Sequence, residues 1–163
     1  MRPARISASA DAPRTMPSTH LSLHCHIVFS TKERIAFIST DWRGRLHSYL
    51  GGIARGLGTT PLAIGGTADH AHVLIGLTSS HRLDYVVRDL KADSSEWIHN
   101  EIGKRSFAWQ KGYGAFSVSS TDLGRVTNYL ARQEEHHQRT TFQDEYLELL
   151  KSSRIEFDER YIW

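Results

Sequence analysis

The sequence predicts an α+β fold built on a mostly antiparallel sheet, and two observations lead to that prediction. Segments in which apolar and polar residues alternate are interspersed with segments in which apolar residues recur every three to four positions. These segments follow one another in the order β-α-β-β-α-β-α, which is typical of an antiparallel sheet with helices packed against it.

Each element has its own signal in the chain. In order, the predicted elements are a disordered tail at residues 1–19, a strand at 20–30, a helix at 40–57, strands at 59–67 and 70–78, a helix at 82–102, a strand-like region at 107–119, a helix from about 121 to 137 and a short acidic helix at 143–151. The tail is rich in Arg, Ala, Ser and Pro and lacks apolar periodicity. The first helix has start residues at Thr40 and Asp41 and glycines at its end.

The later elements are read in the same way. The strand at 70–78 has a Val-Leu-Ile centre that is apolar on both faces, which predicts a central place in the sheet. Ser119, Ser120 and Thr121 supply a cap for the helix that follows. The whole is the ferredoxin-like or RRM-like plan, with helices on one face of the sheet and a further helix near the C-terminus. We therefore expect residues 20–163 to form a single domain.

Composition excludes several classes of protein. The 163 residues hold 20 Lys and Arg, 18 Asp and Glu, ten His and a single cysteine, Cys25. One cysteine permits neither an internal disulfide nor a zinc site built from several cysteines, and it fits a reducing, cytoplasmic setting. The apolar run at residues 73–77 is far too short to span a membrane.

The net charge of +2 is distributed unevenly. Residues 1–15 carry all of it, whereas residues 16–133 have a net charge of +4 and residues 134–163 a net charge of −4. The sequence therefore predicts a basic body followed by an acidic C-terminal segment. Any DNA binding should depend on where charges are placed rather than on a strongly cationic surface.

Two histidine pairs have the spacing of a shared metal site. Residues two apart in a strand point to the same face, so His70 and His72 converge, and so do His24 and His26. Spacing alone does not choose between the pairs. His70 and His72 open the most buried-looking strand, where an unpaired polar group would be costly.

The predicted helix at 121–137 carries a second candidate group. Tyr129 and Gln133 are four residues apart and therefore share a helix face. His136 and His137 are interpreted as charges that interact with the C-terminal end of the helix dipole. Tyr113 is a rival tyrosine, but its place between two glycines predicts a turn.

Together these stretches resemble the small single-tyrosine transposases of the insertion-sequence 200/605 group, within the HUH endonuclease superfamily. The resemblance lies in the strand around His70-Ala71-His72, the block Trp-Gln-Lys-Gly-Tyr-Gly at 109–114, and the segment from Tyr129 to His137. The first predicted strand and the residues after it, at 24–32, and the end of the chain at 157–163 are also similar to that group. The likeness therefore covers about residues 16–163.

The resemblance implies an activity and a site. His70 and His72 match the metal-binding motif of the family, Gln133 matches its third metal ligand, and Tyr129 matches its nucleophile. The family uses Mg²⁺ or Mn²⁺, cuts single-stranded DNA and forms a 5′-phosphotyrosine link. Its members are typically homodimers that recognise DNA hairpins at element ends, with the tyrosine helix completing the partner's site.

Two other functions remain open at this stage. An RRM-like domain could bind DNA or RNA hairpins without chemistry, and a general metallohydrolase could use His70 and His72 with Asp69, which would make Tyr129 dispensable. For either DNA function, the candidate phosphate contacts are Lys32, Arg34, Lys91 and Lys111.

Overall fold

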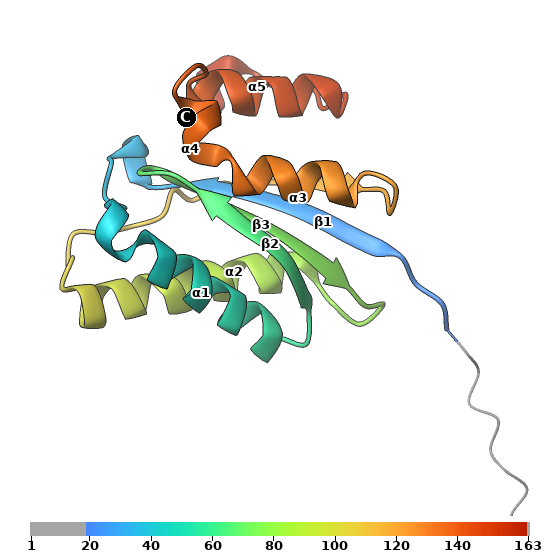
Figure 1. Cartoon of the computed structure of the whole chain (residues 1–163), viewed down its shortest axis with the longest axis horizontal. Coiled ribbons are helices and arrows are strands. Elements are labelled where there is room, and N and C mark those ends of the chain that lie inside the picture. The colour runs from blue at the N-terminus through green and yellow to red at the C-terminus, as the bar shows by residue number, and fades with distance from the viewer. Residues whose placement is uncertain (1–18, 163) are drawn as a thin grey trace, which may run out of the picture.

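The computed structural model describes residues 19–162, and its centre is a four-stranded antiparallel sheet (Figure 1). The strands are β1 (Leu23–Ser30), β2 (Thr60–Gly66), β3 (His70–Leu77) and β4 (Gly114–Val118). They lie in the order β2-β3-β1-β4, so β3 is a central strand, as its apolar sequence predicts. The predicted tail lies outside the described residues, apart from Thr19.

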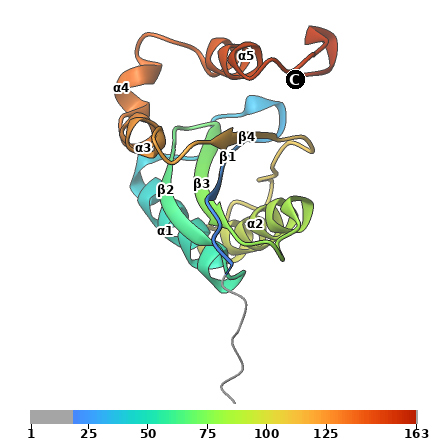
Figure 2. The ribbon, with the colours of Figure 1, turned by 90° about the vertical axis from the view of Figure 1, so that its right-hand side faces the viewer.

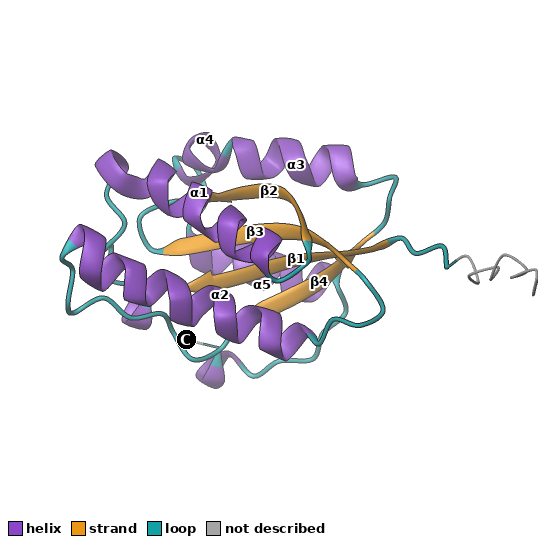
Figure 3. Cartoon of the chain, turned by 90° about the horizontal axis from the view of Figure 1, so that it is seen from below, coloured by secondary structure: helices purple, strands orange, loops and turns teal. Residues whose placement is uncertain are grey.

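Helices cover both faces of this sheet (Figures 1 and 2). They are α1 (Thr40–Gly56), α2 (Leu83–Trp97), α3 (Leu123–Ala131), α4 (Gln133–His137) and α5 (Phe142–Ser152). Helices α1 and α2 lie side by side under one face, as Figure 3 shows from below. The RRM-like prediction is confirmed, and the structure places the later predicted helices, as α3, α4 and α5, over the other face of the sheet. None of the described helices is long and apolar enough to cross a membrane.

Two hydrophobic clusters hold these layers together. The larger one lies between the sheet and helices α1 and α2 and includes Ile27, Phe29, Leu46 and Leu90. The smaller one lies on the opposite face, where Phe142 and Leu150 of α5 pack on Val28 and Phe116. The C-terminal helix is therefore anchored to the sheet by apolar burial.

The structure differs from the predicted elements in two helices and in the last strand, since β4 covers only Gly114–Val118 of the strand-like region at 107–119. The helix predicted at 82–102 ends as α2 at Trp97 and continues as a π-helical turn, Ile98–Ile102. The helix predicted to reach 137 breaks at Arg132, whose φ of −109° and ψ of 24° lie outside the helical region. Tyr129 and Gln133 consequently belong to two helices, α3 and α4, and not to one continuous face.

Candidate metal and nucleophile site

The two histidines that open β3 are fully buried and are held by different neighbours. His70 and His72 are both 0% exposed, and their rings meet edge to face with centroids 4.9 Å apart. Nδ1 of His70 lies 2.7 Å from Oδ1 of Asp69, and Nδ1 of His72 lies 2.9 Å from Nε2 of His26. These contacts occupy the Nδ1 atom of each ring, so each Nε2 atom is the one available for a ligand.

Helices α4 and α5 bring three more polar side chains to these Nε2 atoms. Gln133 Oε1 lies 3.3 Å from His70 Nε2 and 3.0 Å from His137 Nε2. Oε1 of Glu145 lies 3.5 Å from His72 Nε2, and Oε2 of the same carboxylate lies 3.0 Å from His137 Nε2. One ligand atom each from His70, His72, His137 and Glu145 falls within 4.8 Å of the others, which is close enough to share one ion.

Local structure explains why α5 presents Glu145 at this point. The Thr141 hydroxyl accepts a hydrogen bond from the backbone N–H of Asp144, which starts α5 directly after the loop. In the first turn, the ring of Phe142 stacks on His70 with centroids 4.4 Å apart. Glu145 lies one turn further on the same side and is 3% exposed.

Counting protons shows that this cluster fits a cation. The Nδ1–H of His70 donates to the Asp69 carboxylate, and the Nδ1–H of His137 donates to the Thr140 carbonyl. In the neutral rings both Nε2 atoms are then lone-pair acceptors, and both face Gln133 Oε1, which is also an acceptor. Acceptors that converge without a proton between them repel one another, and a bound cation removes that repulsion.

One more buried atom strengthens this conclusion. His72 Nε2 is buried and forms no hydrogen bond. A buried polar atom without a partner is costly, and such atoms mark sites completed by an ion or ligand. The donor set of imidazole nitrogen, amide oxygen and carboxylate suits Mn²⁺ and also accepts Mg²⁺.

Burial favours the neutral forms of Glu145, His137 and His72 in the absence of an ion. It raises the pKa of Glu145 to about 8, with Asp69 and Glu148 adding to the effect. It lowers the pKa of His137 to about 4 and the pKa of His72 well below its usual range. The ion pair that His137 and Glu145 would form at 3.0 Å is therefore opposed by desolvation, and we favour the neutral pair.

Tyr129 lies beside this cluster in the same chain. It is half-buried on α3, with its ring centroid 6.0 Å from that of His72 and 5.2 Å from that of His136. It also lines a cavity of about 470 Å³ between α3, α5 and the sheet, to which Glu145 contributes as well. A single chain thus brings together the predicted nucleophile and the predicted histidines.

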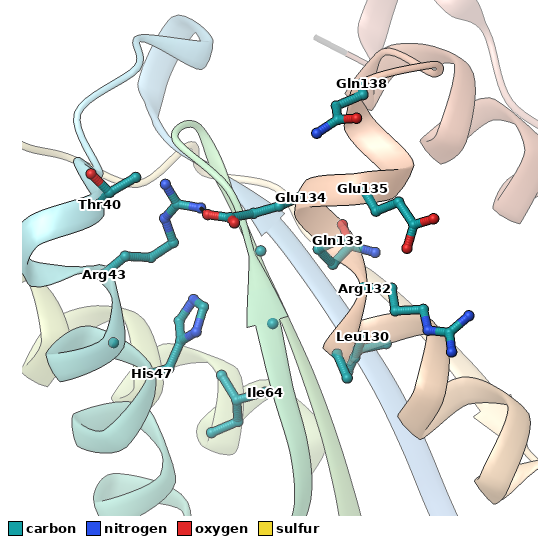
Figure 4. A pocket seen from close by; sticks show the side chains of 14 residues that line it. Thr40, Arg43, His47, Ile64, Leu130, Arg132, Gln133, Glu134, Glu135 and Gln138 are labelled. Atoms are coloured by element: carbon teal, nitrogen blue, oxygen red, sulfur yellow. Dashed lines mark hydrogen bonds and ion pairs between the residues drawn. The ribbon is translucent and has the colours of Figure 1, made fainter.

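A glycine in β2 allows the α3–α4 break to sit this close to the sheet. A Cβ atom at Gly65 would clash with the Leu130 carbonyl and would stand 3.3 Å from Gln133 Cγ. On the outer side of the break, Arg43 of α1 forms an ion pair of 2.5 Å with Glu134 of α4. Figure 4 shows Arg43 and Glu134 reaching toward each other, and both residues line a cavity of about 580 Å³ together with Gln133.

Comparison with known proteins decides the family. The sequence model of the family described as "Transposase IS200 like" matches residues 19–133. The chain belongs to this IS200-like transposase family. No curated protein matches the sequence.

Two solved structures share the fold of this IS200-like transposase. One is a protein from Deinococcus radiodurans described as a transposase, with 21% identity and a TM-score of 0.59 over 73% of this chain and 97% of that one. The other is a REP-associated tyrosine transposase bound to a REP hairpin, with 13% identity and a TM-score of 0.55 over 75% of this chain and 74% of that one.

The rival histidine pair is not the one that converges with the carboxylate. The cluster of possible ligands in the described part of the transposase includes His70 and His72 but neither His24 nor His26. His26 instead contacts His72 and stacks on it, with ring centroids 5.1 Å apart.

Two members of the cluster, His137 and Glu145, are not predicted as ligands by the sequence. Its pattern predicts His137 as a charge at the end of a helix. Glu145 lies in an acidic segment, but it also lies within the apolar stripe of α5 formed by Phe142, Tyr146 and Leu149. A carboxylate inside an apolar stripe was the signal that could have found it. Both residues follow the end of the family match at 133.

The predicted phosphate contacts differ in their surroundings. Lys32 and Lys111 are exposed, and Arg34 is half-buried. The ammonium of Lys91 donates to the carbonyls of Gln110, Lys111 and Gly112 at 2.6, 3.1 and 2.8 Å. Burial lowers the pKa of Lys91 to about 8, while the three carbonyls favour its charged form. Lys91 therefore has no free donor for a phosphate.

Replacing Lys91 with methionine should destabilise the protein and leave DNA affinity unchanged. Three carbonyls of the loop before β4 would lose their donor, at a cost of about 1–3 kcal/mol. Urea unfolding would measure the loss, and fluorescence anisotropy with single-stranded DNA would measure affinity. Lys111→Met is the matched control and should not alter stability. A weakened DNA affinity with unchanged stability would restore Lys91 as a phosphate contact.

Gly65→Ala should damage the site through the α3–α4 break. The added methyl group would push Leu130 away from β2 and carry Gln133 with it, at a cost of about 1–3 kcal/mol. Thermal unfolding and DNA cleavage should both suffer. Gly124→Ala in α3 is the control, because its Cβ would meet nothing within 4 Å, so it should keep or slightly raise stability. Equal behaviour of the two variants would show that the close approach at Gly65 is unimportant.

Proposed function

We propose that this chain is a metal-dependent transposase that nicks and rejoins single-stranded DNA at hairpin-bearing element ends through a 5′-phosphotyrosine intermediate. The observation that carries the proposal is the convergence of ligand atoms from His70, His72, His137 and Glu145, with the ring centroid of Tyr129 6.0 Å from that of His72. Membership of the IS200-like transposase family supports the same activity. We further propose residues 20–163 as one catalytic domain.

In this proposal Tyr129 carries the covalent chemistry. The phenol loses its proton, its oxygen attacks a backbone phosphorus, and the bond from phosphorus to the 3′ oxygen breaks. The leaving 3′ oxygen takes up one proton and becomes a 3′-OH, so no net proton is gained or lost. The DNA downstream of the nick stays on Tyr129 through its 5′ phosphate. A phenol with a pKa near 10 leaves readily when a 3′-OH attacks in return, so the step can be reversed for rejoining.

His70, His72 and Gln133 are the proposed ligands of the ion, with Glu145 and His137 beside them. A bound Mg²⁺ or Mn²⁺ would neutralise charge on the scissile phosphate and on the leaving oxygen. Asp69 orients His70 through the 2.7 Å contact to Nδ1, which is the usual role of a carboxylate behind a metal-binding histidine.

The proposed partners are single-stranded DNA with hairpin ends and a second copy of the chain. One structural relative is described as bound to a REP hairpin, which supports the choice of hairpin DNA. A homodimer with sites completed across subunits would require α3 and α4 to leave their own sheet and dock on the partner. The short connection at Arg132, with its non-helical backbone, is where such an exchange would begin.

Two other functions compete with this proposal. A non-catalytic RRM-like protein that binds DNA or RNA hairpins would need no ion, and the buried Nε2 atom of His72, which has no hydrogen-bond partner, argues against it. A metallohydrolase would use Asp69 with His70 and His72. Asp69 instead contacts the Nδ1 side of His70, away from the converging Nε2 atoms.

The decisive experiment maps the covalent adduct. Protein would be incubated with Mn²⁺ or with EDTA and with 3′-labelled DNA that carries the hairpin end next to this gene, and adducts would be isolated on a denaturing gel. Digestion with trypsin and nuclease should leave nucleotide on the peptide 126–132, in which Tyr129 is the only tyrosine. Tyr113 falls in the separate peptide 112–125.

Each outcome of this mapping has a clear meaning. Modified 126–132 formed with Mn²⁺ and absent with EDTA supports the proposal. Modified 112–125 would move the nucleophile to Tyr113. Binding without an adduct under all conditions would favour the hairpin-binding protein, and cleavage without an adduct would favour the hydrolase.

A further inference from the structure

Four side chains form a stripe across the α3–α4 break, and we call it the Tyr129 stripe. Its members, Tyr129, Arg132, His136 and Arg139, are spaced by three, four and three residues. All four line one cavity of about 380 Å³. Tyr129 and His136 also line the neighbouring cavity between α3 and α5, so they form the wall between the two.

The two arginines of the stripe are free for a ligand. Both are exposed, and within residues 19–162 neither guanidinium has a hydrogen bond or an ion pair. Other cations near the site are engaged, since Arg43 pairs with Glu134 and Arg125 pairs with Asp122. In Figure 4 the guanidinium of Arg132 points away from the Arg43–Glu134 pair.

We propose that Arg132 and Arg139 bind backbone phosphates of the single strand whose scissile phosphate lies at Tyr129. This rests on the proposed function, because it takes Tyr129 as the point of attack. Arginine suits the task because its planar fork donates two hydrogen bonds to one phosphate. Glu135 is the one carboxylate in the same cavity, so the stripe keeps a net positive charge.

The salt dependence of binding tests this assignment. Each phosphate contact to single-stranded DNA adds about 0.7 to the slope of log affinity against log salt concentration. In EDTA, with fluorescein-labelled dT30 as the probe, Arg132→Ala/Arg139→Ala should reduce that slope by about 1.4. We expect affinity to fall about tenfold at low salt.

Matched variants distinguish phosphate contacts at Arg132 and Arg139 from a general effect of removing positive charge. Arg125→Ala removes an exposed arginine of α3 that is already paired with Asp122, and it should leave the slope unchanged. Arg132→Lys/Arg139→Lys keeps both charges and should restore it, while circular dichroism confirms folding of every variant. Equal salt slopes for all variants, or an equal reduction of the slope in Arg125→Ala, would overturn the assignment of Arg132 and Arg139 as phosphate contacts. The binding assay is run in EDTA, where no cleavage is expected, so it does not depend on the nucleophile. A missing adduct in the mapping experiment would refute Tyr129 as the nucleophile and leave the salt slopes unaffected.

A second inference comes from a buried contact on the other side of the cluster. His26 is 3% exposed, and its Nε2 atom is 2.9 Å from Nδ1 of His72. For His72 to offer a lone pair at Nε2, its proton must sit on Nδ1, and within residues 19–162 the one hydrogen-bond partner of that atom is His26. We infer that His26 is a positioning residue, whose Nε2 accepts this hydrogen bond and fixes the ring of His72.

Spectroscopy and ion binding test the role of His26 separately from catalysis. In ion-free protein, ¹⁵N spectra of the imidazoles should show His72 protonated at Nδ1. His26→Leu should weaken Mn²⁺ binding about 10- to 100-fold, and His26→Gln, whose amide oxygen can accept the same bond, should recover most of it. His24→Leu, on the same face of β1, is the control and should bind Mn²⁺ normally.

Two results would overturn the assignment of His26. One is a His72 proton on Nε2 in the ion-free protein, and the other is equal Mn²⁺ affinity in His26→Leu and His24→Leu. If the Nδ1 proton is found but no DNA adduct ever forms, the proposed function fails while the role of His26 stands.

Discussion

Tyr129→Phe should abolish the covalent protein–DNA adduct and lower DNA cleavage at least about thousandfold. The change removes only the phenolic oxygen, for which no neighbouring side chain can substitute in the attack on phosphorus. The phenylalanine ring keeps its packing against His72 and His136, so stability and hairpin affinity should stay close to wild type. Denaturing gels with 3′-labelled DNA measure the adduct, and anisotropy in EDTA measures the affinity.

Tyr113→Phe is the matched control for this prediction. Tyr113 is 40% exposed in the loop before β4, and its ring faces the Lys91 ammonium at 5.9 Å and not the histidine cluster. This variant should form the adduct at the wild-type rate. Cleavage that survives in Tyr129→Phe would contradict the proposed mechanism and would favour hydrolysis by activated water at His70 and His72.

The sheet could be predicted from sequence because each strand has a local pattern. Alternation defines β1, and the doubly apolar centre of β3 places that strand inside the sheet. The break at Arg132 could not be predicted, because no proline or glycine marks it. It depends on long-range contacts instead, chiefly the approach of Leu130 to Gly65 and the burial of Gln133 against His70.

The candidate site could be predicted from the sequence only in part, for the same reason. Strand geometry puts His70 and His72 on one face from two-residue spacing alone. Glu145 lies 73 residues after His72, and only the packing of α5 on the sheet brings the two together. A sequence pattern within one element cannot reveal a ligand that arrives from another, although a carboxylate in an apolar stripe can mark it as a candidate.

Glu145 should give the ion-free protein an unusual loss of stability as the pH rises. Its folded pKa is raised to about 8, so the folded state holds a proton that the unfolded state has already released above pH 4.5. Stability should therefore fall by about 1.4 kcal/mol per pH unit up to about pH 8, or roughly 2 kcal/mol between pH 6.5 and 8. The lowered pKa values of His72 and His137 affect stability only below pH 6.5. There the unfolded state takes up protons that the folded state does not, so stability falls as the pH falls. These two histidines therefore do not contribute between pH 6.5 and 8.

Urea unfolding in EDTA from pH 6.5 to 8 would measure this slope. Glu145→Gln should flatten it, because the amide does not titrate, whereas Glu156→Gln, at an exposed position after α5, should keep it. Adding Mn²⁺ should raise the stability of the wild type most at high pH, where a larger fraction of Glu145 has already lost its proton. It should stabilise Glu145→Gln far less. A flat wild-type profile in EDTA would mean that Glu145 is already ionised against a protonated His137. The cluster would then be a buried ion pair and would not need a cation to satisfy its acceptors.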